Sequence, residues 1–139
     1  MFDQPKRKLA GASNSDGSAA AMIALLAEML HGATKTHMTH LKTESYAAHM
    51  ALGEFYDALP DLADGIAEQY RGVTEKLLDF PSITVTPINT VEDAVNYLRG
   101  LHMKVTQVQD TCSYSEIINE LDMVKSQINS TKYKLLFLH

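Results

Sequence analysis

Apolar side chains recur at steps of three and four residues in four stretches of this sequence, and this spacing places them on one face of an α-helix. We expect the four helices to begin near Ser18, Ser45, Thr90 and Ser113. In the first helix the apolar stripe continues into His37 and His40, so we expect both imidazoles to face the protein interior. The pattern therefore predicts an all-α protein.

Polar residues that cap helices agree with these boundaries. The side-chain oxygen of Ser45 can cap the second helix, as that of Asp16 or Ser18 can cap the first. Thr90 with Asp93 resembles a capping box before the third helix. Ser113 with Glu116 matches the capping box more closely and is expected to open the fourth helix.

The connection between the second and third helices is long and contains helix-breaking residues. Gly72, Pro81 and Pro87 lie in it, and residues 74–78 have room for a short helical turn. Pro60 lies inside the second helix and is expected to kink it. The other two links are short and predict antiparallel hairpins. One long crossover between helices 2 and 3 is the connectivity of a ferritin-like four-helix bundle.

Length and composition predict one domain. The chain has 139 residues, of which 45% are hydrophobic, enough for a core. Residues 1–17 are small and polar and are expected to form a flexible tail, with the bundle in residues 18–139. The longest apolar run, residues 19–30, is shorter than the ~20 residues that span a bilayer. We therefore expect a cytoplasmic protein that does not contact membranes.

Four side chains carry candidate metal chemistry, namely His37, His49, Asp64 and Glu68. Imidazole and carboxylate groups together suit a redox-active metal such as iron. One chain cannot easily bring all four together, because the residues from His49 to Glu68 span roughly 28 Å along a helix. Either the four are unrelated, or the histidines of one subunit meet the carboxylates of another across a two-fold axis.

A di-iron site inside a single bundle is the other arrangement to consider. It would need glutamates on two helices and Glu-x-x-His motifs on the remaining two. The chain has one such motif, formed by Glu28 and His31, and no partner for it on the other helices. We therefore do not expect a di-iron site within one subunit.

Two phrases of the sequence resemble the Dps proteins, or mini-ferritins. HMTHLKTESYAAH (37–49) followed by ALGEFYDALPDLADGIAEQY (51–70) contains that family's two histidines, aspartate and glutamate in order and spacing. The resemblance covers about residues 25–72 and, more loosely, 116–138. It is closest to phage-encoded Dps-like proteins, which share phrases such as HMALGEFYDAL and STKYKLLFL. It implies a homo-oligomer, a dimer at least and up to a dodecameric shell.

The resemblance also implies a ligand set. His37 and His49 would be the imidazole ligands of one subunit, and Asp64 and Glu68 the carboxylates of the other. His40 is an alternative first ligand, because His-Leu-Lys-Thr can be aligned with the family's His-Trp-Asn-Val.

Two positions of this chain depart from the family's pattern. Gly53 stands where the family usually has an acid, and Met38 stands where it commonly has a tryptophan.

By this resemblance the protein would be a ferroxidase that binds non-haem iron, or another divalent metal, at the intersubunit site. Fe(II) would be oxidised by peroxide or oxygen and then stored or sequestered. The competing hypothesis is a structural helical bundle, for example a phage particle component associated with the virion, that keeps the fold without the chemistry. The triplet Lys6, Arg7 and Lys8 predicts weak DNA contact through phosphates or, alternatively, a solubilising tail.

Overall fold

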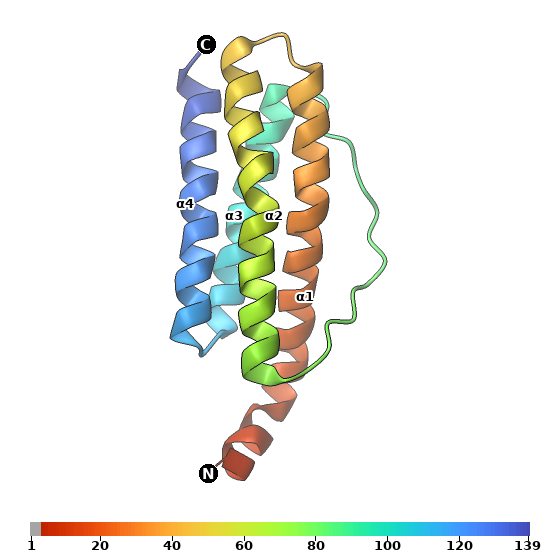
Figure 1. Ribbon diagram of the computed structural model, residues 1–139, viewed down its shortest axis with the longest axis vertical. Coiled ribbons are helices and arrows are strands. Elements are labelled where there is room, and N and C mark those ends of the chain that lie inside the picture. The colour runs from red at the N-terminus through yellow and green to blue at the C-terminus, as the bar shows by residue number, and fades with distance from the viewer. Residues whose placement is uncertain (1–3) are drawn as a thin grey trace.

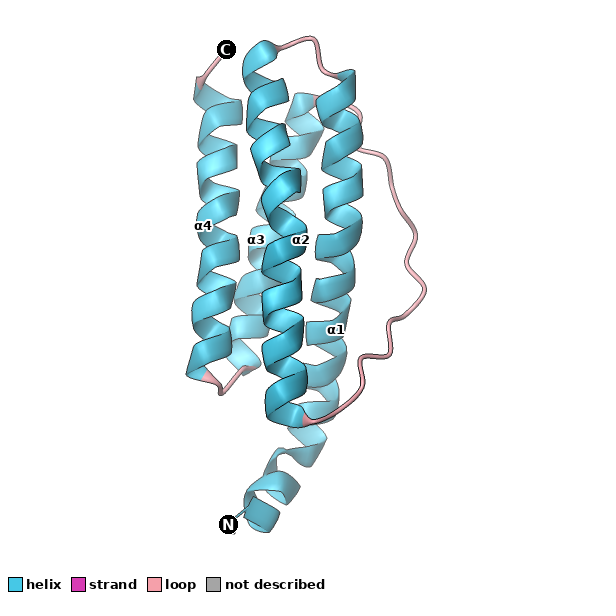
Figure 2. Ribbon diagram, viewed as in Figure 1, coloured by secondary structure: helices cyan, strands magenta, loops and turns pink. Residues whose placement is uncertain are grey.

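The computed structural model describes the backbone of residues 4–139 and the side chains from residue 17 onward. It has four α-helices: α1 (Gln4–Lys42), α2 (Tyr46–Thr74), α3 (Val91–Thr111) and α4 (Ser115–Phe137). They lie side by side as a four-helix bundle, and the described residues contain no strand (Figures 1 and 2). The prediction of an all-α bundle is confirmed.

The connectivity of the bundle has one long crossover. Helix α1 packs against α2 and α3, and α4 packs against the same two helices. Residues 43–45 and 112–114 form short turns that make antiparallel hairpins. Residues 75–90 return along the outside of the bundle, so α2 and α3 run in the same direction (Figure 1). This is the predicted ferritin-like connectivity.

Helix α1 begins earlier than the sequence suggests. Its first residue is Gln4, whereas a helix start at Asp16 or Ser18 is expected from the sequence. Pro5 suits the first turn of a helix, because that turn leaves its N–H groups unpaired in any case. No later proline interrupts the segment. Residues 1–3 of the predicted tail lie outside the described residues, and the flexibility of residues 1–17 stays a prediction.

Two of the predicted capping residues act as caps. The Ser45 hydroxyl accepts a hydrogen bond from the N–H of Ala48 at 3.2 Å. The Thr90 hydroxyl accepts one from the N–H of Asp93 at 3.0 Å. Each hydroxyl satisfies one of the N–H groups that the first turn of a helix leaves unpaired. The starts of α2 and α3 are therefore set by local chemistry.

Two predictions about chain turns are wrong. Helix α4 begins at Ser115 after Tyr114, whose side chain makes no capping hydrogen bond, so Ser113 does not open the helix. Residues 112–114 are all needed to reverse the chain between α3 and α4. The expected helical turn at residues 74–78 is also absent, because Glu75 ends α2 in the left-handed conformation with φ 59°.

The core follows the predicted stripes along most of their length. Fully buried residues include Phe55, Leu26, Met29, Leu52, Leu98 and Leu121. Toward the end of α1 the buried positions are Thr36 and Thr39, while His37 is exposed and His40 is half-buried. The prediction that both histidines face the interior is therefore wrong for His37. The threonines tolerate burial because their hydroxyls have carbonyl partners: Thr36 donates to Gly32, and the single hydroxyl hydrogen of Thr39 has the carbonyls of Lys35 and Ile88 within hydrogen-bonding distance.

The end of the crossover is fastened to the end of α1. The Thr39 hydroxyl lies 2.9 Å from the carbonyl oxygen of Ile88, and the Ile88 side chain is buried in the core. Lys42 donates to the side-chain oxygen of Asn89 at 3.1 Å. These contacts place the start of α3 beside the α1–α2 turn. None of the described helices is long and apolar enough to cross a membrane.

Candidate functional site

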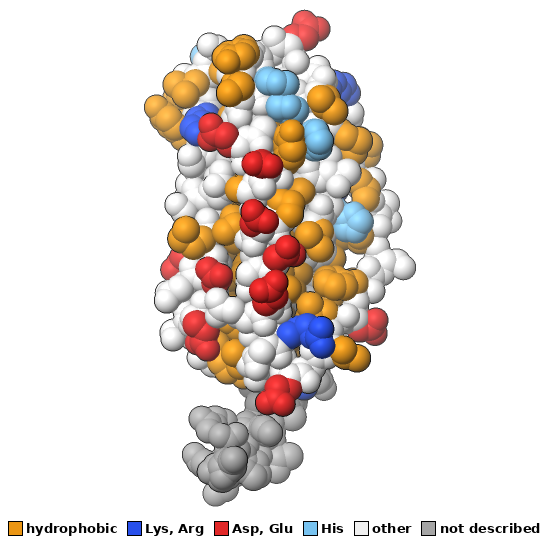
Figure 3. Space-filling model, viewed as in Figure 1, with side chains coloured by type: hydrophobic (Ala, Val, Ile, Leu, Met, Phe, Trp, Pro, Cys, Tyr) orange, Lys and Arg blue, Asp and Glu red, His pale blue; other side chains and the backbone are white. Residues whose placement is uncertain are grey.

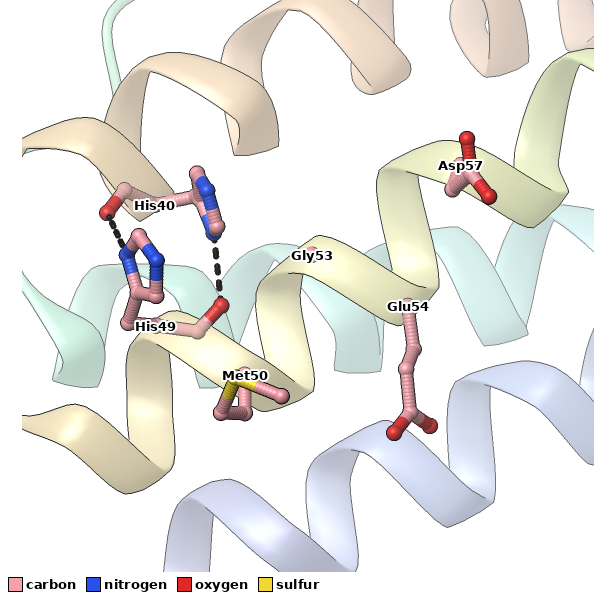
Figure 4. Close-up of a pocket in the computed structure, with 6 residues that line it drawn as sticks. All are labelled: His40, His49, Met50, Gly53, Glu54 and Asp57. Atoms are coloured by element: carbon pink, nitrogen blue, oxygen red, sulfur yellow. Dashed lines mark hydrogen bonds between the residues drawn. The ribbon is translucent and has the colours of Figure 1, made fainter.

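Two histidines face each other across the α1–α2 hairpin, near the turn that joins these helices. His40 on α1 and His49 on α2 have stacked rings, with centroids 3.7 Å apart and planes 19° apart. The Nδ1 atom of His40 lies 2.6 Å from the carbonyl oxygen of His49. In return, the Nδ1 atom of His49 lies 3.0 Å from the carbonyl oxygen of His40 (Figure 4).

These reciprocal hydrogen bonds determine the tautomer of both rings. A carbonyl oxygen can only accept a hydrogen bond, so each Nδ1 must carry the hydrogen and donate it. In the neutral form of His40 and His49, both Nε2 atoms then hold a free lone pair. Histidines that bind metals commonly use this arrangement, in which a backbone carbonyl orients the ring and the other nitrogen is left as the ligand.

The ring that stacks on His49 is that of His40, and His37 lies elsewhere. The His37 ring stacks on the ring of Tyr56, with centroids 3.9 Å apart, and its side chain is exposed. It meets His40 only at an edge, at 5.9 Å between centroids. His40 is therefore the imidazole that lies beside His49.

An open depression of about 310 Å³ adjoins the two rings. Its lining residues are His40, His49, Met50, Gly53, Glu54 and Asp57 (Figure 4). A Cβ atom at Gly53 would lie 3.1 Å from Cε1 of His40, which is tighter than most real contacts. A side chain at this position would therefore require the His40 ring to shift by a few tenths of an ångström.

Sequence reasoning did not single out Asp57 or Met50, which also line the depression. Asp57 lies two helical turns after His49 on the same helix, and this spacing is the signal that could have found it. Glu54 is less available, because its carboxylate accepts from Lys134 of α4 at 2.7 Å.

The predicted carboxylate ligands lie far from the histidines of the same chain. Asp64 and Glu68 are exposed on α2, about 22 and 28 Å along the helix from His49. They belong to a column of exposed acids on α2 below the histidines, comprising Glu54, Asp57, Asp61, Asp64 and Glu68 (Figure 3). Within residues 17–139, no three His, Cys, Asp or Glu side chains converge in a way that could hold a metal ion.

The Glu28-x-x-His31 motif belongs to a different kind of cluster. The buried Glu28 carboxylate accepts from the ammonium of Lys35 at 3.1 Å and from the hydroxyl of Tyr97 at 2.7 Å. Lys104 lies 3.8 Å away. Burial by itself would raise the pKa of Glu28, but these hydrogen bonds and positive charges outweigh it and lower that pKa. The charge of Glu28 is thus balanced by Lys35 and Lys104.

The basic triplet cannot be placed at the site. Lys6, Arg7 and Lys8 belong to the first turns of α1, and their side chains lie outside the described residues. DNA contact through this triplet stays a prediction.

Comparison with known proteins finds a relative encoded by a phage. The chain is 34% identical over 58 residues to a protein of Enterobacteria phage T4 described as an uncharacterized 14.6 kDa protein in the mobD-ri intergenic region. The match covers 40% of this chain and 45% of that relative, less than half the length of each. No solved structure matches the chain. The model of DUF5856, a family of unknown function, matches residues 40–135, more than half of the chain, and the protein therefore belongs to that family.

Proposed function

We propose that this protein binds Fe(II) at a site that two copies complete and oxidises it there, as the resemblance to Dps proteins implies. The observation that carries the proposal is the pair of reciprocal hydrogen bonds between His40 and His49. They leave two Nε2 lone pairs on neighbouring rings next to a surface depression. Imidazole nitrogen suits iron, and also other divalent metals such as zinc.

A second copy would supply the missing ligands. One chain offers two imidazoles, and Asp64 and Glu68 lie too far along α2 to reach them. If two α2 helices pack antiparallel about a two-fold axis, the histidine end of one copy meets the Asp64 and Glu68 end of the other. The column of carboxylates on α2 disfavours such contact without a cation between the copies, because like charges would face each other.

Each residue of the proposed site has a distinct role. The backbone carbonyls of His40 and His49 hold the rings as neutral Nδ1–H tautomers, ready to donate the Nε2 lone pair. Because the rings are stacked, with centroids 3.7 Å apart, binding of one ion by both Nε2 atoms requires one ring to turn and to give up its hydrogen bond to the facing carbonyl. Carboxylates from the second copy add negative charge, which favours Fe(III) over Fe(II). The oxidant, peroxide or oxygen, accepts the electron that each Fe(II) ion loses.

An anaerobic titration with Fe(II), followed by peroxide while ferric absorbance is recorded, tests the proposal. We expect saturable binding and rapid oxidation by the wild type. His40→Ala, His49→Ala, Asp64→Ala and Glu68→Ala should each weaken Fe(II) binding by about tenfold or more, because each removes a ligand.

Two exposed residues near the proposed ligands provide matched controls. His37→Ala removes an imidazole that stacks on Tyr56, and Asp61→Ala removes a carboxylate one turn before Asp64. Both should bind Fe(II) as the wild type does. If the four ligand variants bind no worse than these two controls, the assignment of the site is wrong.

A structural role is the second candidate, in which the bundle is a component of a phage particle and carries no metal. The lack of a three-ligand cluster among residues 17–139 favours it, and the similarity to an uncharacterized phage T4 protein supports a phage origin without naming a role. In that case no variant of the histidines or carboxylates would change any Fe(II) signal. With the iron-binding role we also propose a cytoplasmic location, a dodecameric shell and weak DNA contact through Lys6, Arg7 and Lys8. With the structural role we propose a location in the virion.

A further inference from the structure

One end of the bundle exposes large apolar side chains. The α1–α2 turn and the last residues of α4 lie at this end, and a salt bridge between Glu54 and Lys134 joins α2 to α4 there (Figure 1). Six exposed residues make up what we name the apolar end: Leu41, Tyr46, Met50, Tyr133, Phe137 and Leu138. Apolar side chains are visible around this end in Figure 3.

The exposed area at the apolar end is large for a small protein. Tyr46 is 77% exposed, Phe137 67% and Tyr133 55%. Since an aromatic side chain offers ~150–250 Å² for burial, these three alone present roughly 300–500 Å². Leu41, Met50 and Leu138 raise the apolar end to roughly 600 Å². An apolar surface of this size is at the upper end of what monomeric proteins expose, and such patches are often functional.

We propose that the apolar end packs against the apolar end of a second copy of this chain. Two copies that bury about 600 Å² each reach the roughly 1,200 Å² at which stable protein interfaces begin. In a two-fold symmetric dimer each copy contributes the same surface, so the apolar end alone can form the interface. Tyrosine, phenylalanine and methionine are the residue types that the cores of protein interfaces favour.

The charges around the apolar end permit this contact. Lys134 forms a salt bridge with Glu54, and Lys42 and Glu44 are exposed near the α1–α2 turn, so both signs are present and two identical ends do not strongly repel each other. The column of acids on α2 is less suited to a direct contact between copies, because it holds five carboxylates and no Lys or Arg between residues 46 and 70. The contact at the apolar end needs no metal, although Met50 belongs to this surface and also lines the depression beside His40 and His49.

Sedimentation velocity in buffer with EDTA, at protein concentrations from about 1 to 100 μM, tests the proposal. The test variant is the double substitution Tyr46→Ser/Phe137→Ser, at two exposed positions where folding does not need the ring. The matched control is Met103→Ser/Met123→Ser, which removes two exposed apolar side chains of α3 and α4 that do not belong to the apolar end. Circular dichroism melting checks that both variants fold.

The expected result is concentration-dependent association of the wild type and the control in EDTA. The Tyr46→Ser/Phe137→Ser variant should dissociate with a Kd raised by about tenfold or more. A wild type that stays monomeric throughout, or a control as impaired as the test variant, overturns the proposal. A monomeric wild type that floats with phosphatidylcholine vesicles would overturn it too, because the apolar end would then face lipid.

Discussion

Glu28 illustrates how one buried carboxylate constrains the residues around it. Its side chain lies between α1 and α3, where Lys35 and Tyr97 both donate to the same oxygen. The Tyr97 hydroxyl fits only because Gly32 has no side chain, since a Cβ there would collide with it. Burial and the Glu28 charge raise the pKa of Tyr97, so its hydroxyl remains a donor at neutral pH.

The lowered pKa of Glu28 predicts a stability that depends on acidity. A carboxyl group with a lower pKa in the folded state stabilises that state above the unfolded pKa, and this contribution is lost as the pH falls through the folded value. We expect the free energy of unfolding, from urea titrations, to fall as the pH drops below the ordinary glutamate value of 4.5.

The variant Glu28→Gln removes the titrating group from this network. It should flatten the acid dependence and cost about 3 kcal/mol at pH 7, because Lys35 is left buried without its partner. Glu68→Gln, at an exposed position of α2, is the control and should leave the acid dependence unchanged. An equal acid dependence in Glu28→Gln and the wild type would contradict the role of Glu28.

At the scale of the element, the two hairpins begin their second helices in different ways. Helix α2 has a side-chain cap from Ser45. Helix α4 has none and starts after Tyr114, although Ser113 and Glu116 have the spacing of a capping box. The three-residue turn between α3 and α4 holds Cys112 and Tyr114 in extended conformations, so the helix cannot begin as early as the motif suggests.

Two substitutions distinguish a hydroxyl that caps a helix from one that merely has the right spacing. Thr90→Ala removes the acceptor of the Asp93 N–H and should lower the free energy of unfolding by about 1 kcal/mol. Ser113→Ala should change it by less than about 0.5 kcal/mol, because this side chain caps nothing. Urea unfolding measures the free energy of unfolding of both variants. Equal losses would contradict the assignment of Thr90, and not Ser113, as a helix cap.

At the scale of the whole molecule, the crossover determines the direction of α3. Residues 75–90 are largely exposed, but Ile88 enters the core and its carbonyl accepts from Thr39. This attachment returns the chain to the end of the bundle where α2 begins. Helices α2 and α3 can then run parallel on opposite corners, with an antiparallel neighbour on every side.

The attachment of the crossover should therefore be stronger at Ile88 than elsewhere along it. Ile88→Ala is expected to cost about 2–3 kcal/mol, since it leaves a cavity at the edge of the core. Ile83→Ala, at a half-buried position of the same segment, should cost about 1 kcal/mol or less. The midpoints of guanidinium unfolding measure both losses of stability. A larger loss for Ile83→Ala than for Ile88→Ala would show that Ile88 is not the main attachment of the crossover.

Much of the fold could be predicted from local patterns. The stripes through Leu98 and Leu121, the caps at Ser45 and Thr90 and the long crossover all rest on neighbouring residues or on helix periodicity. The candidate site was harder to predict from the sequence. Periodicity left His37 and His40 as alternative ligands, since both lie near the edge of the α1 stripe. Asp57 was not predicted, because it belongs to no recognised motif.

The sequence by itself determined the fold class of this protein, because two requirements are local. Apolar residues that recur with the helical period of 3.6 lie on one face to be buried, and the first turn of a helix needs a capping hydrogen bond. Only the tertiary structure decided that His40, and not His37, lies against His49. That choice depends on how α1 is rotated about its axis when Thr36 and Thr39 pack inward. It also decided that Glu28 belongs to a buried ion pair, because Lys35 and Tyr97 meet it only after α1 and α3 have packed together.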